Sequence, residues 1–241
     1  MDILSFIRPS PEQRIRKLRK KVKEPHGDAS VRQNAAQRLF EMGTEPALRA
    51  LLDRFTINVS PSVQDEAEKQ EVFNWLVSLG HEAIPPLLSF LKNERAVYWP
   101  ARTLREILSG DELAEHFGDV LHFLWENPPA TAFPKAQIIR SLEGVVSEKL
   151  VETVLSFLED EDDDVRLAAI EYLLDQPEEA ARESILQCYL DSEGRPRVRI
   201  QILDHLSDKG WSVRGFRPAV EETLPEGYAL TREGRVRKVG L

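Results

Sequence analysis

The sequence predicts an all-α solenoid of about six helical hairpins, followed by a short C-terminal β-hairpin. Three observations lead to this prediction. Apolar residues recur at helical spacing, the recurring segments start 28 to 38 residues apart, and period-two alternation is missing until the end of the chain. A repeat of this length is typical of one helix–turn–helix unit.

The first helix of each unit carries apolar residues at offsets of four, five and eight from its leading residue. This spacing places them on one face of a helix. Val31, Val165 and Val198 lead three units, and an arginine follows each of them. The apolar residues that follow are Ala35, Ala36 and Leu39, then Ala169, Ile170 and Leu173, then Ile202, Leu203 and Leu206. With three weaker copies, the units start at residues 31, 68, 96, 134, 165 and 198.

A turn and a second apolar helix follow each first helix. Glycine suits the left-handed residue after a helix end, and Thr, Asp or Ser then caps the next helix. The turns are Gly43-Thr44-Glu45, Gly80-His81-Glu82, Gly110-Asp111-Glu112 and a degenerate Ser147-Glu148. The second helices carry Leu48, Leu51, Leu52 and Phe55, then Ile84, Leu87, Leu88 and Leu91, then Val151, Val154, Leu155 and Leu158.

These residues resemble the HEAT-repeat family, including the short HEAT-like repeats named after phycobilisome lyases. The shared features are Asp-x-x-Val-Arg at a helix start, after Asp28 and Asp162, and the Gly-x-Glu-Ala turn at Gly80. Pro100 is similar to the proline that kinks a first helix in this family. The resemblance covers about residues 27 to 224 and implies a fold rather than an activity. In a stacked array the second helices line a concave face that can hold a partner.

Six consecutive carboxylates, Glu159 to Asp164, stand where one unit ends and the next begins. Asp162 to Asp164 fall at an expected helix start, where the helix dipole favours negative charge. A calcium loop would need a glycine within spaced oxygen ligands, and this run has none. We interpret the run as a solvated helix-cap corner, with a metal site as the alternative.

Motifs for catalysis, cofactors or metals are missing from the sequence, so we predict no catalytic, cofactor-binding or metal-binding residues. Deoxyhypusine hydroxylase, an enzyme built from HEAT-like repeats, uses several His-Glu pairs for two irons, whereas this chain has the single pair His81-Glu82. Cys188 lies in an apolar helical context typical of a buried thiol. The alternative is an enzyme of the bilin-lyase-like or metal-dependent type.

The N-terminal segment, residues 1–24, is basic although the chain has a net charge of −9. Residues 8 to 23 contain eight bases and one acid, around a narrow apolar stripe. The stripe is Ile15, Leu18 and Val22, and the candidate basic patch is Arg14, Lys17, Lys20 and Lys21. We expect this amphipathic helix to cap the array. It could instead lie on an anionic membrane, anchored by Ile3, Leu4, Phe6 and Ile7, or touch nucleic acid.

The last segment, residues 225–241, departs from the repeat pattern of residues 25–224. Two short β-prone stretches, 228–231 and 235–239, flank Glu233-Gly234 and predict a hairpin. A lone hairpin is marginal in water, so we expect it to dock on the last helices or to offer its edge to a partner.

We therefore expect a non-enzymatic scaffold or adaptor that binds another protein through its concave face. Candidate contacts are residues that point away from the apolar stripes of the second helices, namely Arg49, Asp53, Pro85 and Ser89. The single cysteine, the short apolar runs and the lack of a secretory signal predict a cytoplasmic protein.

Overall fold

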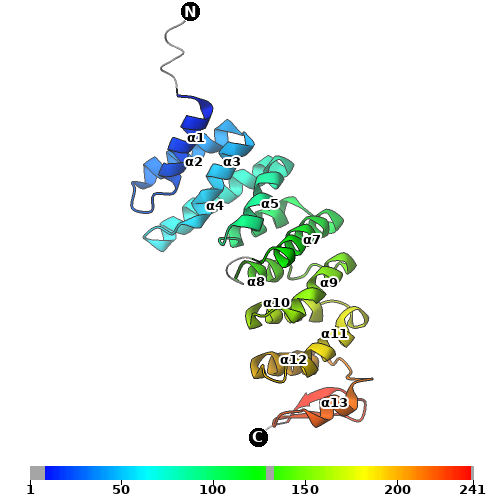
Figure 1. Ribbon diagram of the computed structural model, residues 1–241. Helices are drawn as coiled ribbons and strands as arrows, with labels where there is room; N and C mark the ends of the chain where they lie inside the picture. Colours follow the sequence, from blue (N-terminus) through cyan, green and yellow to red (C-terminus); the bar gives the residue numbers. More distant parts are fainter. Residues whose placement is uncertain (1–8, 129–132, 240–241) are drawn as a thin grey trace, which may run out of the picture. The chain divides into compact units, whose positions relative to one another are not determined.

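The computed structural model describes residues 9–128 and 133–239, and nearly all of its regular structure is helical (Figure 1). The chain divides into two compact units, residues 1–113 and 114–241, and the boundary in the sequence falls within helix α7, Gly110–Glu126. Within the described ranges, no helix has the length and apolar character needed to cross a membrane.

The first unit contains helix α1 and the first helices of the array. Their bounds are α1 Pro11–Val22, α2 Ala29–Met42, α3 Glu45–Leu52, α4 Ser62–Leu79, α5 Ile84–Asn93 and α6 Tyr98–Ile107. Two 3₁₀ turns, η2 Asp53–Thr56 and η3 Gly80–Ala83, join these helices. The start of α7 completes this unit.

The second unit contains the rest of α7, six further helices and a two-stranded sheet. Their bounds are α8 Phe133–Arg140, α9 Glu148–Leu155, η4 Ser156–Glu159, α10 Asp163–Leu174, α11 Glu178–Asp191, α12 Pro196–Lys209, α13 Arg217–Glu222, β1 Tyr228–Leu230 and β2 Val236–Lys238. Helices α2 to α13 form the six predicted pairs, which confirms the all-α solenoid of helical hairpins.

Local sequence signals set several helix ends. Asp28 begins α2 by accepting hydrogen bonds from the backbone N–H groups of Ser30 (2.8 Å) and Val31 (3.3 Å). Asp162 caps α10 in the same way. Gly43 ends α2 with φ +60, a conformation that glycine adopts without steric cost. Thr44, the predicted cap of α3, makes no side-chain capping bond.

The two N-terminal helix pairs and α1 share one apolar core. The apolar stripe of α1 faces α2 and α3, with Val22 fully buried and Ile15 and Leu18 half-buried. The helix therefore packs on α2 and α3 through its apolar stripe. Residues 1–8, including the candidate membrane anchors Ile3, Leu4, Phe6 and Ile7, lie outside the described residues.

Three details of the predicted core need correction. Val31 is 44% exposed, whereas Val165 and Val198 are fully buried, because a complete helix pair precedes those two and only α1 precedes Val31. Leu88 is half-buried, while its neighbour Leu87 is fully buried. Pro100 does not kink α6, because it is the third residue of that helix and no turn precedes it. A first-turn N–H has no intrahelical partner, so proline is tolerated there.

Bases from neighbouring helices bind the acidic run of residues 159–164. Asp160 is buried and forms an ion pair with Lys135 of α8, which is also buried. The next unit supplies Arg195 to Asp163, and Arg197 of α12 to Asp164 at 2.8 Å. The helix-cap interpretation is confirmed at Asp162, but the corner is not merely solvated. It is an electrostatic joint between three consecutive helix pairs.

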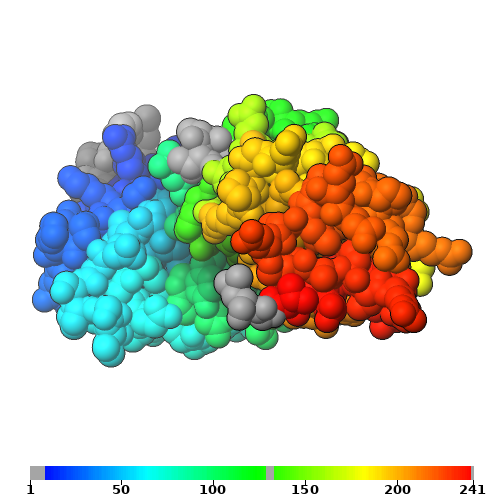
Figure 2. All heavy atoms as spheres, turned by 90° about the horizontal axis from the view of Figure 1, so that it is seen from below, coloured from blue at the N-terminus to red at the C-terminus, as the bar shows by residue number. Residues whose placement is uncertain are grey.

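The C-terminal hairpin forms as predicted and docks on α12. Strands β1 and β2 pair antiparallel, with Ala229 opposite Arg237. The Tyr228 hydroxyl donates a hydrogen bond to Asp204 of α12 at 2.7 Å, and Lys238 forms an ion pair with the same carboxylate at 2.9 Å. In Figure 2 the orange and red C-terminal residues cover the α12 end of the second unit.

Candidate functional site

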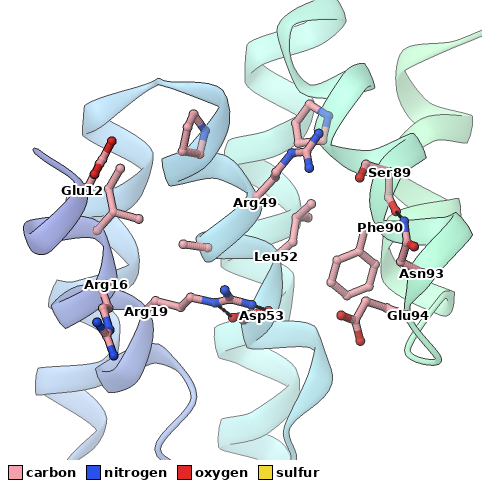
Figure 3. A pocket seen from close by; sticks show the side chains of 14 residues that line it. Glu12, Arg16, Arg19, Arg49, Leu52, Asp53, Ser89, Phe90, Asn93 and Glu94 are labelled. Atoms are coloured by element: carbon pink, nitrogen blue, oxygen red, sulfur yellow. Dashed lines mark hydrogen bonds and ion pairs between the residues drawn. The ribbon is translucent and has the colours of Figure 1, made fainter.

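A cavity of about 640 Å³ opens in the first unit between α1, α3 and α5. The outward face of α3 forms its floor, and α1 and α5 form its walls (Figure 3). Its lining includes apolar side chains on all three helices, namely Ile15, Pro46, Ala50, Leu52, Pro86 and Phe90. Polar and charged side chains complete it, namely Glu12, Arg16, Arg19, Arg49, Asp53, Ser89, Asn93 and Glu94.

An ion pair between α1 and the end of α3 closes the floor of this cavity. The Arg19 guanidinium donates hydrogen bonds to both carboxylate oxygens of Asp53, and Lys23 lies 3.8 Å from the same carboxylate (Figure 3). The hydrogen bond to Asp53 raises the pKa of Arg19 above its usual value. This pair fastens α1 across the cavity floor.

The four predicted contact residues do not share one environment. Arg49 is exposed on the rim and forms an ion pair with Glu45 at 2.7 Å, and Ser89 is half-buried in the opposite wall. Asp53 is not open to a partner as predicted, because its side chain is only 3% exposed beneath Arg19. Pro85 is exposed but does not line the cavity.

Sequence reasoning missed the contribution of α1 to this site. Arg16 and Arg19 line the cavity, but the prediction treated α1 as a cap on the end of the array and assigned the partner face to second helices alone. The signal in the sequence was the pair Ile15 and Arg19. They stand at i and i+4, so a base shares a helix face with the apolar stripe.

The predicted basic patch of α1 is exposed. Arg14, Lys17, Lys20 and Lys21 all lie on the solvent side of the helix, as does the cavity residue Arg16. None of these five bases forms an ion pair within residues 9–128, in contrast to Arg19 and Lys23 on the same helix. The apolar stripe packs inward, so one helix carries both a packed apolar face and an exposed basic face.

A second charged cluster lies buried behind α3 and fixes the position of α4. Glu68 accepts hydrogen bonds from Arg32 of α2 and from Arg54 of η2, at 2.6 to 2.9 Å. Asp65 accepts from Arg54 and Lys69, each at 2.7 Å. Each charged group in this cluster contacts at least one group of opposite charge, so the cluster joins α2, η2 and α4 and leaves none of these groups open for chemistry.

Other reactive side chains do not converge. In the described ranges, no three His, Cys, Asp or Glu side chains are placed to hold a metal ion. His81 is exposed in η3 and its ring nitrogen lies 3.1 Å from Glu112. Cys188 is buried, and this burial raises the pKa of its thiol above the usual value. A raised pKa keeps a thiol protonated and unreactive at neutral pH.

The α1–α3–α5 cavity therefore has the features of a recognition site. Its volume lies within the range of about 300 to 1,000 Å³ that binding pockets occupy, and apolar walls with a few polar groups are typical of such pockets. Arg16, Arg49 and Glu94 give it charged edges, while the Arg19–Asp53 pair gives it a fixed floor.

The comparisons with known proteins bear on the fold. Residues 133–207, which run from α8 into α12, match the family described as HEAT repeats. Neither the curated proteins nor the solved structures include a match to this chain.

Proposed function

We propose that this chain, whose residues 133–207 match the family described as HEAT repeats, is a non-enzymatic scaffold or adaptor for another protein. HEAT repeats are commonly protein-interaction scaffolds. In this proposal the partner binds in the α1–α3–α5 cavity. Arg49 contacts it from the cavity rim, Ser89 from the wall that α5 forms, and Arg16 from the wall that α1 forms.

One observation carries the proposal: the cavity is preformed. The Arg19–Asp53 pair ties α1 to the end of α3, and the buried Arg32–Glu68 pair ties α2 to α4 behind it. A preformed site loses little conformational freedom of its own on binding, and this lowers the total ordering cost when a partner docks. This property suits an interaction module.

The competing class is a HEAT-like-repeat enzyme, bilin-lyase-like or metal-dependent. Metal analysis of the purified protein separates this class from a metal-free scaffold. Stoichiometric iron retained through purification would overturn the proposal. The proposal also places the protein in the cytoplasm, because its single cysteine leaves it without an internal disulfide, as is usual in a reducing compartment.

Site-specific photocrosslinking tests the proposal directly. A photoreactive amino acid replaces Arg49 at the cavity rim, and in a matched control it replaces Arg214, which is also exposed. Each protein is irradiated in native lysate, and the crosslinked species are identified by mass spectrometry. We expect one protein to crosslink in stoichiometric yield at position 49 and not at position 214. Equal crosslinking at both positions, or none at position 49, would contradict a partner site in the cavity.

A further inference from the structure

The solvent side of α1 carries a concentration of positive charge that nothing in residues 9–128 neutralises. Arg14, Lys17 and Lys21 are spaced by three and four residues, and Arg16 and Lys20 by four. Side chains at these spacings are neighbours on a helix, and like charges there destabilise the helix. An anionic partner would relieve this repulsion.

The basic face of α1 continues into the α1–α3–α5 cavity. Arg16 belongs to both, because it lines the cavity (Figure 3) and precedes Lys20 by four residues, which is about one helical turn. The cavity offers the apolar surface of Ile15 next to Arg16 on α1 and that of Phe90 on the opposite wall, which α5 forms. A ligand that spans both regions needs an apolar group for the cavity and negative charge beside it.

The charges of the cavity argue against nucleic acid as that ligand. Besides Asp53, which Arg19 covers, the carboxylates of Glu12 and Glu94 line it, so negative charge stands next to the bases. A nucleic acid carries a phosphate at every nucleotide and would bring some of them against these carboxylates. A peptide can place its carboxylates only where the bases are.

The packing of α1 argues against a membrane surface. A helix that binds a bilayer buries its apolar face among the lipids. Here Val22 is fully buried against the repeats, and Ile15 and Leu18 are half-buried, so the described part of this helix has no free apolar face to insert.

We propose that the cavity and the basic face of α1 together bind an acidic–apolar segment of a protein partner. An apolar side chain of the segment enters the cavity, and Asp or Glu side chains beside it pair with Arg16, Lys17 and Lys20. The inference rests on the proposed scaffold function and adds the chemical class of the partner.

A selection of random twelve-residue peptides tests this inference. The library is selected on the wild-type chain, on Arg16→Glu/Lys17→Glu/Lys20→Glu, and on the matched control Arg214→Glu/Arg232→Glu/Arg237→Glu. The three control arginines are exposed bases of the second unit that form no ion pair within residues 133–239, and their reversal changes the net charge equally. We expect the wild type and the control to enrich acidic peptides containing a large apolar residue. These enriched peptides should bind the α1 variant at least 10-fold more weakly than they bind the wild type.

Two serine substitutions test the cavity itself. Ser89→Phe adds bulk inside the cavity, while Ser207→Phe adds the same bulk at a half-buried position of α12. The enriched peptides should bind Ser89→Phe at least 10-fold more weakly and bind Ser207→Phe as they bind the wild type. Unchanged far-ultraviolet circular dichroism and an unchanged urea midpoint establish that each variant is folded, and Lys17→Gln/Lys20→Gln serves as a milder second variant.

The other outcomes separate the two proposals. Neutral or basic enriched peptides, or acidic peptides that bind the α1 variant equally well, overturn the inference but leave the scaffold function standing. Failure to enrich any peptide, together with no crosslinking at position 49, overturns both. Binding of a twelve-nucleotide oligothymidine or of phosphatidylserine vesicles, lost in the α1 variant while no peptide binds, reassigns the basic face to those ligands and overturns the inference.

Discussion

Arg32 and Glu68 form a two-pronged ion pair between α2 and α4. The Nε and Nη2 atoms of the arginine lie 2.7 and 2.6 Å from the two carboxylate oxygens, and both side chains are largely buried. Arg54 donates to the same carboxylate at 2.9 Å. One carboxylate therefore accepts hydrogen bonds from two guanidinium groups in the core of the first unit, so replacing Glu68 affects both arginines.

Replacing Glu68 with glutamine should strongly destabilise the first unit. The amide keeps the shape of the side chain but leaves Arg32 and Arg54 without this counter-charge. Breaking a buried ion pair by removing one partner typically costs about 3 to 5 kcal/mol. Urea unfolding followed by circular dichroism measures the loss in the free energy of unfolding.

Glu71→Gln is the matched control, one turn further along the same helix. Glu71 is half-buried and accepts a single hydrogen bond from Gln33 at 2.6 Å, so we expect a change below about 1 kcal/mol. If the two variants lose similar free energy of unfolding, the buried ion pairs of Glu68 stabilise the unit no more than the single hydrogen bond of Glu71 does.

Acid should weaken the first unit through the same network. Burial by itself raises the pKa of Glu68 and Asp65, but hydrogen bonds from the neighbouring bases outweigh it and hold both pKa values below the usual range. A carboxyl with a lowered folded pKa contributes stability that is present above its unfolded pKa, near pH 4, and is lost as the pH falls through the folded pKa.

The stability gap between the wild type and Glu68→Gln should therefore shrink as the pH falls below about 4. Urea midpoints measured between pH 6 and pH 2.5 give this gap directly. The comparison cancels most of the titration of other carboxylates, because the two chains share them. A gap that stays constant over the whole range would show that the pKa of Glu68 is not lowered by folding.

Adjacent leucines on α5 should differ in their cost of truncation. Leu87 is fully buried and Leu88 is half-buried. Leu87→Ala should cost about 2 to 5 kcal/mol, since it leaves a cavity in the core, whereas Leu88→Ala should cost about half as much or less. Urea unfolding of both variants shows which substitution lowers the free energy of unfolding more. A larger decrease for Leu88→Ala would mean that Leu88, and not Leu87, faces the core.

Apolar periodicity predicted all six helix pairs, because each pair must bury apolar side chains against the adjacent pairs. Periodicity could not predict Val31, since burial there depends on what precedes the helix. It also could not predict that Arg32 is buried while Val31 is exposed. The partner of Arg32 is Glu68, 36 residues away, and no local pattern links the two.

The candidate site was predictable only in part for the same reason. Arg49 and Ser89 were found because they lie on the outward faces of second helices, a local property. The burial of Asp53 depends on Arg19, 34 residues earlier, so only the folded chain brings the pair together. The acidic run was similar, because its capping residue Asp162 acts locally but the bases that bind it come from other helix pairs.

Removing Lys135 from the acidic joint should cost far more than removing an exposed base from the same joint. Lys135 and Asp160 are both buried, so Lys135→Met leaves a buried carboxylate without its counter-charge and should cost about 3 to 5 kcal/mol. Arg197 and Asp164 form an exposed pair at 2.8 Å, so Arg197→Met should cost less than about 1 kcal/mol.

Urea unfolding of the two variants, with Lys135→Met/Asp160→Asn as a third, checks this prediction. The double variant removes both charges and should recover much of the loss, because the penalty comes from the unpaired carboxylate and not from the missing lysine. Recovery of stability in the double variant would show that the buried pair fixes how the helices of the joint are placed and adds little net stability. If the double variant is as unstable as Lys135→Met, the lysine stem contributes by packing, and the stability of the joint does not depend on the charge of Asp160.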